Sequence, residues 1–385
     1  MDKIKLGIIG YGNMGTSHAR NIAEGKVPNV ELVAVCDIDS ARREVCAKNH
    51  PTVELFDNFE ALMQSGLCDS VLIAVPHYDH PTMAIRAFEL GLNVLVEKPA
   101  GVYTKQVLEM NEAAKKSDKV FGIMYNQRTD RVYQRLKQMI DNGELGHIKR
   151  ITWIVTSWYR CQAYHNSSAW RSRWETEGGG TLINQNPHQL DLWQWLFGVP
   201  DRVYAKVAFG KYYDIEVEDE VVAFFDYDNG TIGQYITSTA EAPGTNRLEI
   251  ACDMGRIIVE GDTITFNKNE ISEREWNRTR KVPFGKPRTD VITEKIAETT
   301  NQHATLLTNY AQAVLTGSPL LAPGEEGIKG LTISNSIHLS GWTGETIDVK
   351  NFPHDKFYNL LQEKIKNSTF KKTVNKVVGD TRGTY

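Results

Sequence analysis

Short apolar runs recur along the first third of the chain, each ending near glycine, proline or an acidic residue. They lie at 5–9, 30–36, 70–75, 93–96 and 120–124. Because these runs do not alternate with polar residues, they are typical of strands buried on both faces of a parallel sheet. Helical patterns fill the gaps, including 14–24 and 81–90. This succession predicts a doubly wound α/β domain over residues 1–125.

The pattern changes after about residue 126 to longer apolar runs with partial alternation. They lie at 151–158, 203–209, 220–227, 231–238, 246–251 and 255–260. Asp228-Asn229-Gly230, between two of these runs, is a strong hairpin signal. Strands joined by turns predict a second, α+β domain over 126–350 with a large open, mostly antiparallel sheet. We expect helices near 188–197 and 301–316 to cover it, and a basic surface helix and tail over 351–385.

Composition narrows the class of protein. A chain of 385 residues with 41% hydrophobic and 24% charged residues is typical of a globular protein of two or three domains. A net charge of −4 argues against a nucleic-acid partner, and no apolar stretch approaches the roughly 18 residues needed to span a membrane. The five cysteines show no C-x-x-C spacing. They indicate reduced thiols in a cytoplasmic protein without a metal site.

A glycine-rich loop, G-x-G-x-x-G, lies between the first predicted strand and the first predicted helix. The first glycine permits a tight turn, the second lets the backbone approach a pyrophosphate, and the third lets helix and strand pack closely. The helix N-terminus then offers N–H groups to the phosphates. The sequence therefore predicts a dinucleotide site that includes Gly10, Tyr11, Gly12, Asn13, Met14 and Gly15.

Asp37 closes the second predicted strand, 22 residues after Gly15. A carboxylate at this place can accept hydrogen bonds from the adenosine ribose hydroxyls. The same charge repels a 2′-phosphate, so we expect NAD as the cofactor in preference to NADP. Asp39 adds to this repulsion, whereas Arg42 and Arg43 could weaken it.

Glu97-Lys98-Pro99 closes the fourth predicted strand. A lysine at the carboxyl end of a parallel strand points toward the crevice where ligands bind, and a positive nicotinamide ring nearby would lower its pKa. With this motif in this place, the chain resembles the glucose–fructose oxidoreductase/inositol dehydrogenase (Gfo/Idh/MocA) family over about residues 4–350. The resemblance implies that Lys98 lies beside the nicotinamide and the substrate, and that the Lys98–Pro99 peptide bond is cis.

Further segments match the family. They are Ala74-Val75-Pro76 with His77 and His80, Asn126-Gln127-Arg128, and Trp170-Arg171. The resemblance implies that these segments line the nicotinamide half of the cofactor site, with contacts from Ala74, Pro76, His77, His80, Glu97, Lys98, Gln127, Trp170 and Arg171. Gly341-Trp342-Thr343-Gly344 resembles the turn before the family's last strand.

The segment 178–191 matches the family's second motif, a glycine-rich turn followed by D-x-x-x-H-x-x-D. His188 and Asp191 fall on the histidine and the last acid, but Asn184 stands where the family has its first aspartate. Without that carboxylate the imidazolium form of His188 is less favoured. Asn186-Pro187 looks like an N-cap and a first helical residue, and a helix N-terminus disfavours a positive charge further. We therefore expect a neutral His188.

Lys98 and His188 are the expected catalytic residues, one removing a hydroxyl proton while the other holds the oxygen. Either Lys98 or His188 can take the role of proton acceptor on the sequence alone. Asn184 and Asp191 are expected to bind substrate, although Asp191 could equally bond to backbone or to an arginine. Aromatic and guanidinium groups suit a sugar, which predicts a substrate site with Trp158, Tyr159, Tyr164, Trp170 and Arg171. At least one aromatic side chain of these or Trp174 is expected to contact the sugar, although aromatics also fill cores and interfaces.

The resemblance implies an NAD(H)-dependent oxidoreductase that transfers a hydride between nicotinamide and a secondary hydroxyl or ketone of a sugar-like substrate. Asn184 and the aromatic segment favour oxidation at C3 of a glucoside or related glycoside, with NAD that could stay bound between turnovers. Inositol dehydrogenase is the nearest alternative. An enzyme that cleaves glycosides through transient C3 oxidation is another, and a non-catalytic NAD(H) sensor is disfavoured by Lys98 and His188. A large sheet with one helical face also predicts a homo-oligomer.

Overall fold

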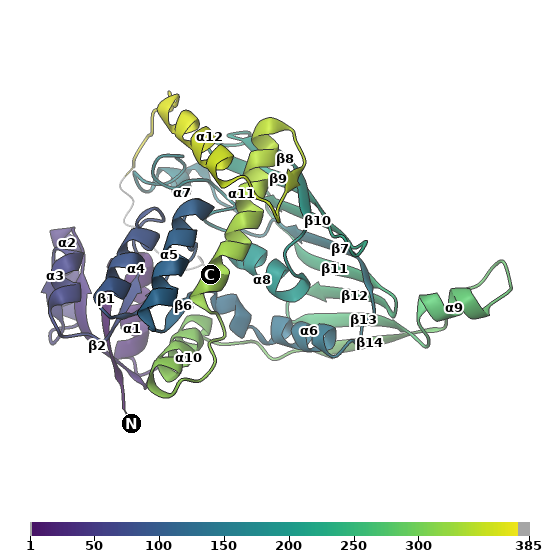
Figure 1. Cartoon of the computed structure of the whole chain (residues 1–385), viewed down its shortest axis with the longest axis horizontal. Coiled ribbons are helices and arrows are strands. Elements are labelled where there is room, and N and C mark those ends of the chain that lie inside the picture. The colour runs from purple at the N-terminus through teal and green to yellow at the C-terminus, as the bar shows by residue number, and fades with distance from the viewer. Residues whose placement is uncertain (1, 376–385) are drawn as a thin grey trace.

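The computed structural model describes residues 2–375 and contains two sheets (Figure 1). The first has six parallel strands in the order β3-β2-β1-β4-β5-β6. Its strands are β1 (Ile4–Ile9), β2 (Val30–Cys36), β3 (Glu54–Phe56), β4 (Ser70–Ile73), β5 (Asn93–Val96) and β6 (Phe121–Ile123). The five expected strands and the doubly wound class are confirmed. The short β3, without an apolar run of its own, was not expected.

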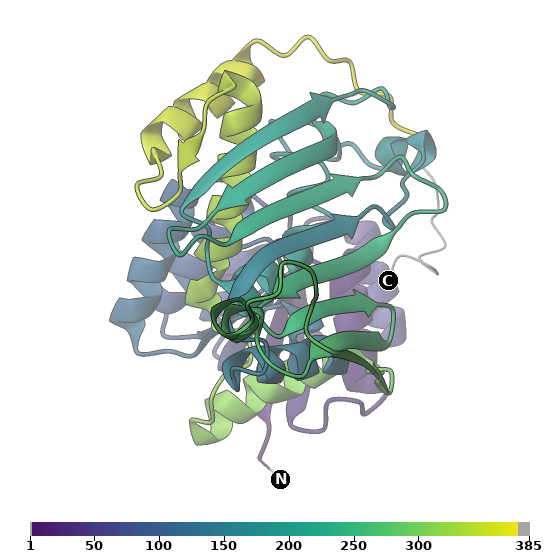
Figure 2. The same ribbon diagram turned by 90° about the vertical axis from the view of Figure 1, so that its right-hand side faces the viewer.

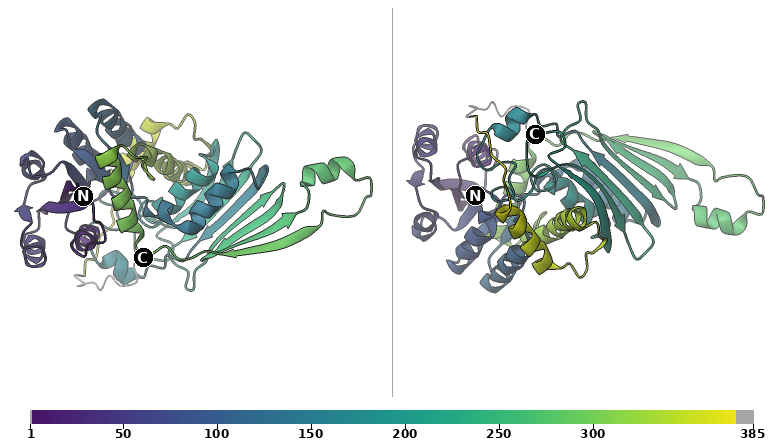
Figure 3. Two further views of the ribbon diagram at one scale, coloured as in Figure 1. Left: turned by 90° about the horizontal axis from the view of Figure 1, so that it is seen from below. Right: turned by 90° about the horizontal axis from the view of Figure 1, so that it is seen from above.

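Helices cover both faces of this sheet (Figure 3). They include α1 (Asn13–Ala23), α2 (Ser40–Asn49), α3 (Phe59–Gln64), α4 (Asp79–Glu89) and α5 (Thr104–Ser117). The strands are buried because of this double cover; Leu6 and Ile8 of β1 and Val71 and Leu72 of β4 are all 0% exposed. The carboxyl ends of β1, β2, β4 and β5 lead into the segments that carry the predicted cofactor residues.

The second sheet has nine strands in the order β14-β13-β12-β11-β7-β10-β9-β8-β15. Its strands are β7 (Ile148–Val155), β8 (Arg202–Phe209), β9 (Glu218–Asp226), β10 (Ile232–Ser238), β11 (Asn246–Cys252), β12 (Gly255–Glu260), β13 (Thr263–Asn269), β14 (Thr289–Lys295) and β15 (Ile347–Asp348). The β7–β10 pair is parallel and the other pairs are antiparallel, so the expected mostly antiparallel sheet is confirmed. Tyr227 and Thr231 close the predicted hairpin between β9 and β10.

One face of the second sheet packs against α6 (Arg131–Asp141), α8 (Pro187–Phe197) and α11 (Gly327–Thr343). Trp153 and Tyr235 from the sheet, Trp193 from α8 and Ile337 from α11 form its core, each 0% exposed. The opposite face is turned toward the viewer in Figure 2, and no helix within residues 2–375 packs across it. The connection between β13 and β14, which contains α9 (Glu273–Thr279), projects away from the body (Figure 3).

One expected helix covers a different sheet. The helix predicted near 301–316 exists as α10 (Gln302–Thr316), but Leu307, Tyr310 and Ala311 are buried in the core of the first sheet. The expectation was wrong because an apolar stripe shows that a helix has a buried face but not which sheet it meets. The second cover of the nine-stranded sheet is α11, which lies between the two sheets in Figure 1.

The C-terminal region begins with the expected surface helix, α12 (His354–Lys366), which buries Phe357 and Leu361. The predicted tail beyond residue 375 lies outside the described residues. The expected turn at 341–344 is only partly present: residues 341–343 end α11, and Gly344 follows in a left-handed conformation before β15. Within residues 2–375 no helix is long and apolar enough to cross a membrane, and no group of His, Cys, Asp and Glu could hold a metal ion.

Candidate functional site

The loop between β1 and α1 requires its first and third glycines. Gly10 has a φ of +96°, and a Cβ there would lie 2.4 Å from the carbonyl oxygen of Ala74. A Cβ on Gly15 would lie 1.9 Å from the carbonyl oxygen of Gly10. The first turn of α1, from Asn13 to Thr16, carries no charged side chain. Its N–H groups at the positive end of the helix dipole therefore fit a pyrophosphate.

Asp37 lies at the end of β2 and is 6% exposed. Its Oδ2 accepts the backbone N–H of Tyr11 at 2.7 Å, and its Oδ1 accepts that of Asp39 at 2.8 Å. Arg42 Nη1 lies 3.5 Å from Oδ2. Asp37 therefore holds the glycine loop as well as occupying the position of a ribose-binding acid, and Arg42 partly balances its charge.

Lys98 follows β5, and its peptide bond to Pro99 is cis, as the resemblance implied. Its Nζ donates a hydrogen bond to the backbone carbonyl oxygen of Asn184 at 2.9 Å. Burial lowers the pKa of the Lys98 ammonium, and the nearby Glu97 carboxylate opposes this effect. The contact joins the end of a strand in the first sheet to the segment that leads into α8.

Glu97 supports Lys98 from within the protein. Its Oε1 contacts His18 Nε2 at 2.7 Å, and its Oε2 accepts the backbone N–H of Lys98 at 3.2 Å. Burial alone would raise the pKa of Glu97, but the hydrogen bond and charge of His18 outweigh it and bring that pKa to about 2. Glu97 is 4% exposed and engaged in these contacts, which favours a role in holding Lys98, and its direct contact with the cofactor stays a prediction.

His188 lies in the first turn of α8 and is 9% exposed. Burial first, and then the positive charge of Lys98, lower its pKa well below the ordinary value. The neutral state of His188 that the sequence predicted therefore arises from burial and the charge of Lys98, and not from a capped helix N-terminus. Asn186 does not cap the helix with its side chain, because that side chain bonds to Thr181 and Tyr235 instead.

A polar group gathers around Tyr164, which lies in α7 (Gln162–Asn166). Its hydroxyl accepts hydrogen bonds from Arg171 Nη1 at 2.5 Å and from Gln185 Nε2 at 3.0 Å. The Arg171 guanidinium lies 4.4 Å from the centroid of the Tyr164 ring and 4.6 Å from that of Trp170. Next to Gln185, the Asn184 side-chain amide donates a hydrogen bond to the Glu177 carboxylate.

The other predicted aromatic contacts divide into two groups. The Arg160 guanidinium lies 5.6 Å from the centroid of the Trp158 ring and 5.0 Å from that of Tyr164, which connects Trp158 to this polar group. Tyr159 is 47% exposed. Trp174, in contrast, is buried in a separate core against Trp342. Trp174 therefore fills a core, which leaves the sugar contact to the other candidates.

Asp191 does not face the site. Its two carboxylate oxygens pair with Arg128 Nη2 at 2.6 Å and Nε at 2.8 Å, and both side chains are 1% exposed. Gln194 donates a further hydrogen bond to Oδ1. A buried arginine and an amide therefore already occupy its acceptors, which favours the arginine contact over the predicted substrate contact. The sequence had left this alternative open.

His80 and His77 hold backbone segments around Lys98. The two ring nitrogens of His80 lie 2.7 Å from the carbonyl oxygen of Pro99 and 2.8 Å from that of Val75, so neither is available to the cofactor. His77 Nδ1 lies 3.0 Å from the carbonyl oxygen of Glu177, and its ring meets that of Trp170 edge-on. These contacts favour a role for His80 in positioning the Lys98–Pro99 turn, and its direct contact with NAD stays a prediction.

Two residues at this place were not expected from the sequence, Glu177 and Gln185. Glu177 immediately precedes the three glycines at 178–180, and Gln185 follows Asn184. Their adjacency to the recognised motif was the available signal, but the contacts themselves depend on how the turn at 171–180 folds back.

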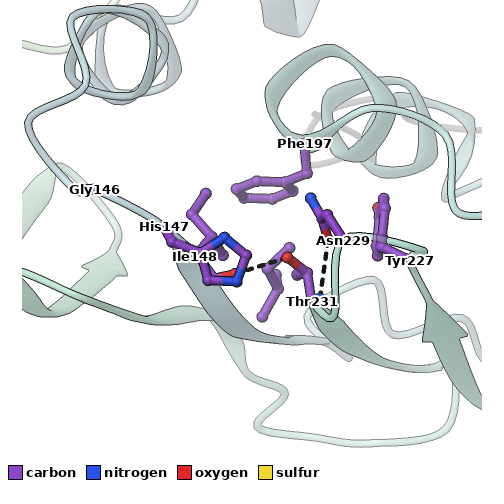
Figure 4. A pocket seen from close by; sticks show the side chains of 8 residues that line it. Gly146, His147, Ile148, Phe197, Tyr227, Asn229 and Thr231 are labelled. Atoms are coloured by element: carbon purple, nitrogen blue, oxygen red, sulfur yellow. Dashed lines mark hydrogen bonds between the residues drawn. The ribbon is translucent and has the colours of Figure 1, made fainter. Parts of the chain in front are cut away.

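A surface hollow of about 230 Å³ lies elsewhere, between the start of β7 and the β9–β10 hairpin (Figure 4). Thr231 donates a hydrogen bond to the carbonyl oxygen of Ile148 there, and Asn229 accepts one from the backbone N–H of Thr231. The titratable side chains in its lining are His147 and Tyr227. The convergence of charged and titratable groups is at Lys98 and not at this hollow.

Comparison with known families gives a match to both halves of the chain. The family described as "Oxidoreductase family, NAD-binding Rossmann fold" matches residues 4–125. The "GFO/IDH/MocA C-terminal domain" matches residues 133–258. These ranges cover the glycine loop, Asp37, Lys98 and His188.

Individual proteins are similar at lower levels. The chain is 27% identical to D-glucoside 3-dehydrogenase from Escherichia coli over 258 residues, 62% of this chain and 70% of that protein. It is 30% identical to inositol 2-dehydrogenase from Corynebacterium glutamicum over 146 residues, which are 38% of this chain and 43% of that protein. Its fold is similar to that of the WlbA dehydrogenase from Bordetella pertussis in complex with NADH and UDP-GlcNAcA. That similarity has a TM-score of 0.75 at 24% identity, covering 90% of this chain and 98% of the other.

Proposed function

The chain belongs to the GFO/IDH/MocA oxidoreductase family and is an NAD-dependent dehydrogenase that acts on CH–OH groups; we propose that its substrate is a glucoside or a related glycoside, oxidised at C3. The observation that carries the proposal is the meeting of Lys98, Asn184 and His188. Lys98 follows strand β5 of the NAD-binding domain. Asn184 precedes helix α8 of the second domain, and His188 lies in the first turn of that helix. The residues of the glycine loop and Asp37 fit NAD.

His188 is the proton acceptor in this proposal. Its lowered pKa keeps it neutral at pH 7, so a ring nitrogen can take the proton of the substrate hydroxyl. Lys98 holds the oxygen instead. An ammonium has three N–H donors, and the one directed at Asn184 leaves others for the substrate oxygen as negative charge develops on it. When bound, NAD supplies the acceptor for the hydride that leaves the carbinol carbon.

Tyr164, Trp170 and Arg171 form the proposed sugar-binding side. Aromatic faces can pack on the C–H faces of a pyranose ring, and a guanidinium can donate to its hydroxyls. Asn184 lies between this group and Lys98 and can bind a hydroxyl next to the one that is oxidised. The similarity to D-glucoside 3-dehydrogenase supports a glucoside, while that to inositol 2-dehydrogenase keeps inositol as the alternative.

Matched substrates test the proposal. The purified protein at substrate-level concentration is mixed with NAD and methyl D-glucoside, its 3-deoxy analogue, or myo-inositol, and absorbance at about 340 nm is recorded. Enzyme in this amount reveals a single turnover even where the cofactor stays bound. We expect a signal with methyl glucoside and none with the 3-deoxy analogue. Equal rates with both glucosides, or a faster reaction with inositol, would overturn the C3 assignment.

A chromogenic glycoside separates oxidation from cleavage. An enzyme that only oxidises the glycoside converts the C3 hydroxyl of p-nitrophenyl glucoside to a ketone and leaves the bond to p-nitrophenol unbroken. Release of p-nitrophenol without net formation of NADH would instead assign a glycoside-cleaving activity to the same site, because oxidation at C3 acidifies the neighbouring C2–H and permits elimination. The two products are distinguished in one reaction by absorbance and mass.

A further inference from the structure

Glu177 and Lys98 both contact Asn184, from opposite parts of that residue. The Asn184 side-chain Nδ2 donates a hydrogen bond to Glu177 Oε1, and its backbone carbonyl accepts one from Lys98 Nζ at 2.9 Å. Glu177 is 3% exposed and lies in the turn before the 178–180 glycines. A chain of two hydrogen bonds therefore connects a buried carboxylate to the lysine at the proposed reaction centre.

An ionised carboxylate only accepts hydrogen bonds, and this fixes the orientation of the Asn184 amide. The Nδ2 group must face Glu177, so the carbonyl oxygen Oδ1 must point the other way. Held in this orientation, Asn184 presents Oδ1 as a hydrogen-bond acceptor. The matching group on a substrate is a hydroxyl that donates its proton. Were Glu177 protonated, it could donate to Oδ1 as readily as accept from Nδ2, and the amide would have no fixed orientation.

Several groups around Glu177 control its charge. Its Oε2 accepts the backbone N–H of Ser172, and Arg171 Nη1 lies 3.9 Å from Oε1. Burial raises the pKa of Glu177 to about 6, an effect increased by the charge of Glu218 and opposed by Arg171, Ser172 and Asn184. The other charged or titratable groups that face it are Lys98, Lys372 and His77. Glu177 therefore changes charge close to neutral pH.

We propose that Glu177 is a positioning residue that, from the 171–177 turn, holds the Asn184 amide with its carbonyl oxygen toward a substrate hydroxyl. The inference rests on the proposed function, because it needs a polyhydroxylated substrate at Lys98. It adds a specificity rule: the hydroxyl next to the oxidised one must be a hydrogen-bond donor.

The rule predicts a pH dependence of substrate binding. Above pH 6 Glu177 is ionised, the amide is held, and KM is low. As pH falls through about 6 the carboxylate takes up a proton, the amide loses its orientation, and KM rises. In a Glu177→Gln variant the neutral amide can both donate and accept, so KM should be high at every pH and this acid limb should vanish.

A charge swap tests the assignment more sharply than removal alone. Glu177→Gln should raise KM about tenfold, the effect of one lost hydrogen bond, with a smaller change in kcat. Asn184→Asp places two carboxylates in contact and should also be impaired. The double variant Glu177→Gln with Asn184→Asp restores one carboxylate beside one amide, and should recover most of the wild-type kcat/KM. The matched control is Glu175→Gln, because Glu175 is exposed and pairs with Arg173 at the surface.

Two results would overturn the proposal: an unchanged KM and acid limb in Glu177→Gln, or a double variant no better than the worse single variant. The kinetics are measured with whichever substrate of the glucoside and inositol panel reacts. The role of Glu177 can therefore be tested even if the glucoside proposal fails. A further readout needs no substrate. The infrared band of a protonated buried carboxyl group should titrate near pH 6 in the wild-type protein and be missing from Glu177→Gln, and a band with no such difference would contradict the assignment.

Discussion

Lys98 Nζ lies 2.9 Å from the backbone carbonyl oxygen of Asn184 and donates a hydrogen bond to it. Lys98 follows β5 of the six-stranded sheet, whereas Asn184 precedes α8, which packs on the nine-stranded sheet. Their contact places the family lysine against the segment that carries His188. A half-buried lysine that lies near the Glu97 carboxylate and donates to a backbone carbonyl has a fixed position, which suits a group that must hold a reacting oxygen.

Lys98→Met should abolish most of the turnover while preserving the fold. Methionine has a similar length but no charge and no donor, so the oxygen of the substrate loses its ammonium partner. We expect kcat to fall by roughly a thousandfold, within the range found for acid–base and electrostatic groups. NADH binding, followed by fluorescence titration, should change little. A variant with unchanged turnover would remove Lys98 from the mechanism.

Asp37→Asn should shift the cofactor preference toward NADP. Asparagine can still accept the N–H of Tyr11, so the glycine loop is retained while the negative charge is lost. Arg42 and Arg43 are then opposed only by Asp39 in attracting a 2′-phosphate. We expect the NADP/NAD ratio of kcat/KM to rise by about 10- to 100-fold, as for a hydrogen bond to a charged group. The same ratio in wild type and variant would show that Asp37 acts on the loop alone.

Asp191→Asn should destabilise the protein and spare the chemistry. Removing the carboxylate leaves the Arg128 guanidinium buried, with Glu326 as its remaining acidic partner. Breaking one side of a buried ion pair costs about 3–5 kcal/mol, which denaturant unfolding can measure. At low temperature, where the variant stays folded, kcat and KM should be close to wild type. A stable variant without turnover would instead restore the substrate role predicted from the sequence.

The open face of the nine-stranded sheet predicts pairing with a second copy of the chain. Phe224 and Ile232 are 43% and 54% exposed there, in neighbouring strands. Pairing of two copies through this face would cover them. Light scattering after size exclusion should give an oligomer for the wild type and a monomer for Phe224→Asp. Leu108→Asp, at a 41% exposed site on α5, is the control and should stay oligomeric; a monomeric wild type would contradict the prediction.

Local pattern predicted most strands of both sheets and the glycine loop, because burial on two faces and tight turns leave marks in consecutive residues. It gave no strand at β3, β13 or β15. It could not place α10, whose apolar stripe fits either sheet, and it missed β14, which is exposed along almost its whole length and so has no buried face. Asp191 and Glu177 show the same limit at the site. A carboxylate's partner is set by distant residues, and only the fold revealed that Asp191 faces Arg128 and that Glu177 faces Asn184.

The central claim is that this NAD-dependent dehydrogenase removes hydride from C3 of a glucoside. Methyl glucoside labelled with deuterium at C3 tests it most directly, in a single turnover with stoichiometric enzyme and NAD, followed by mass spectrometry of both products. The account predicts that the label moves to the reduced nicotinamide ring and that the sugar product carries a ketone at C3. Label that remains on the sugar while NADH forms would contradict it.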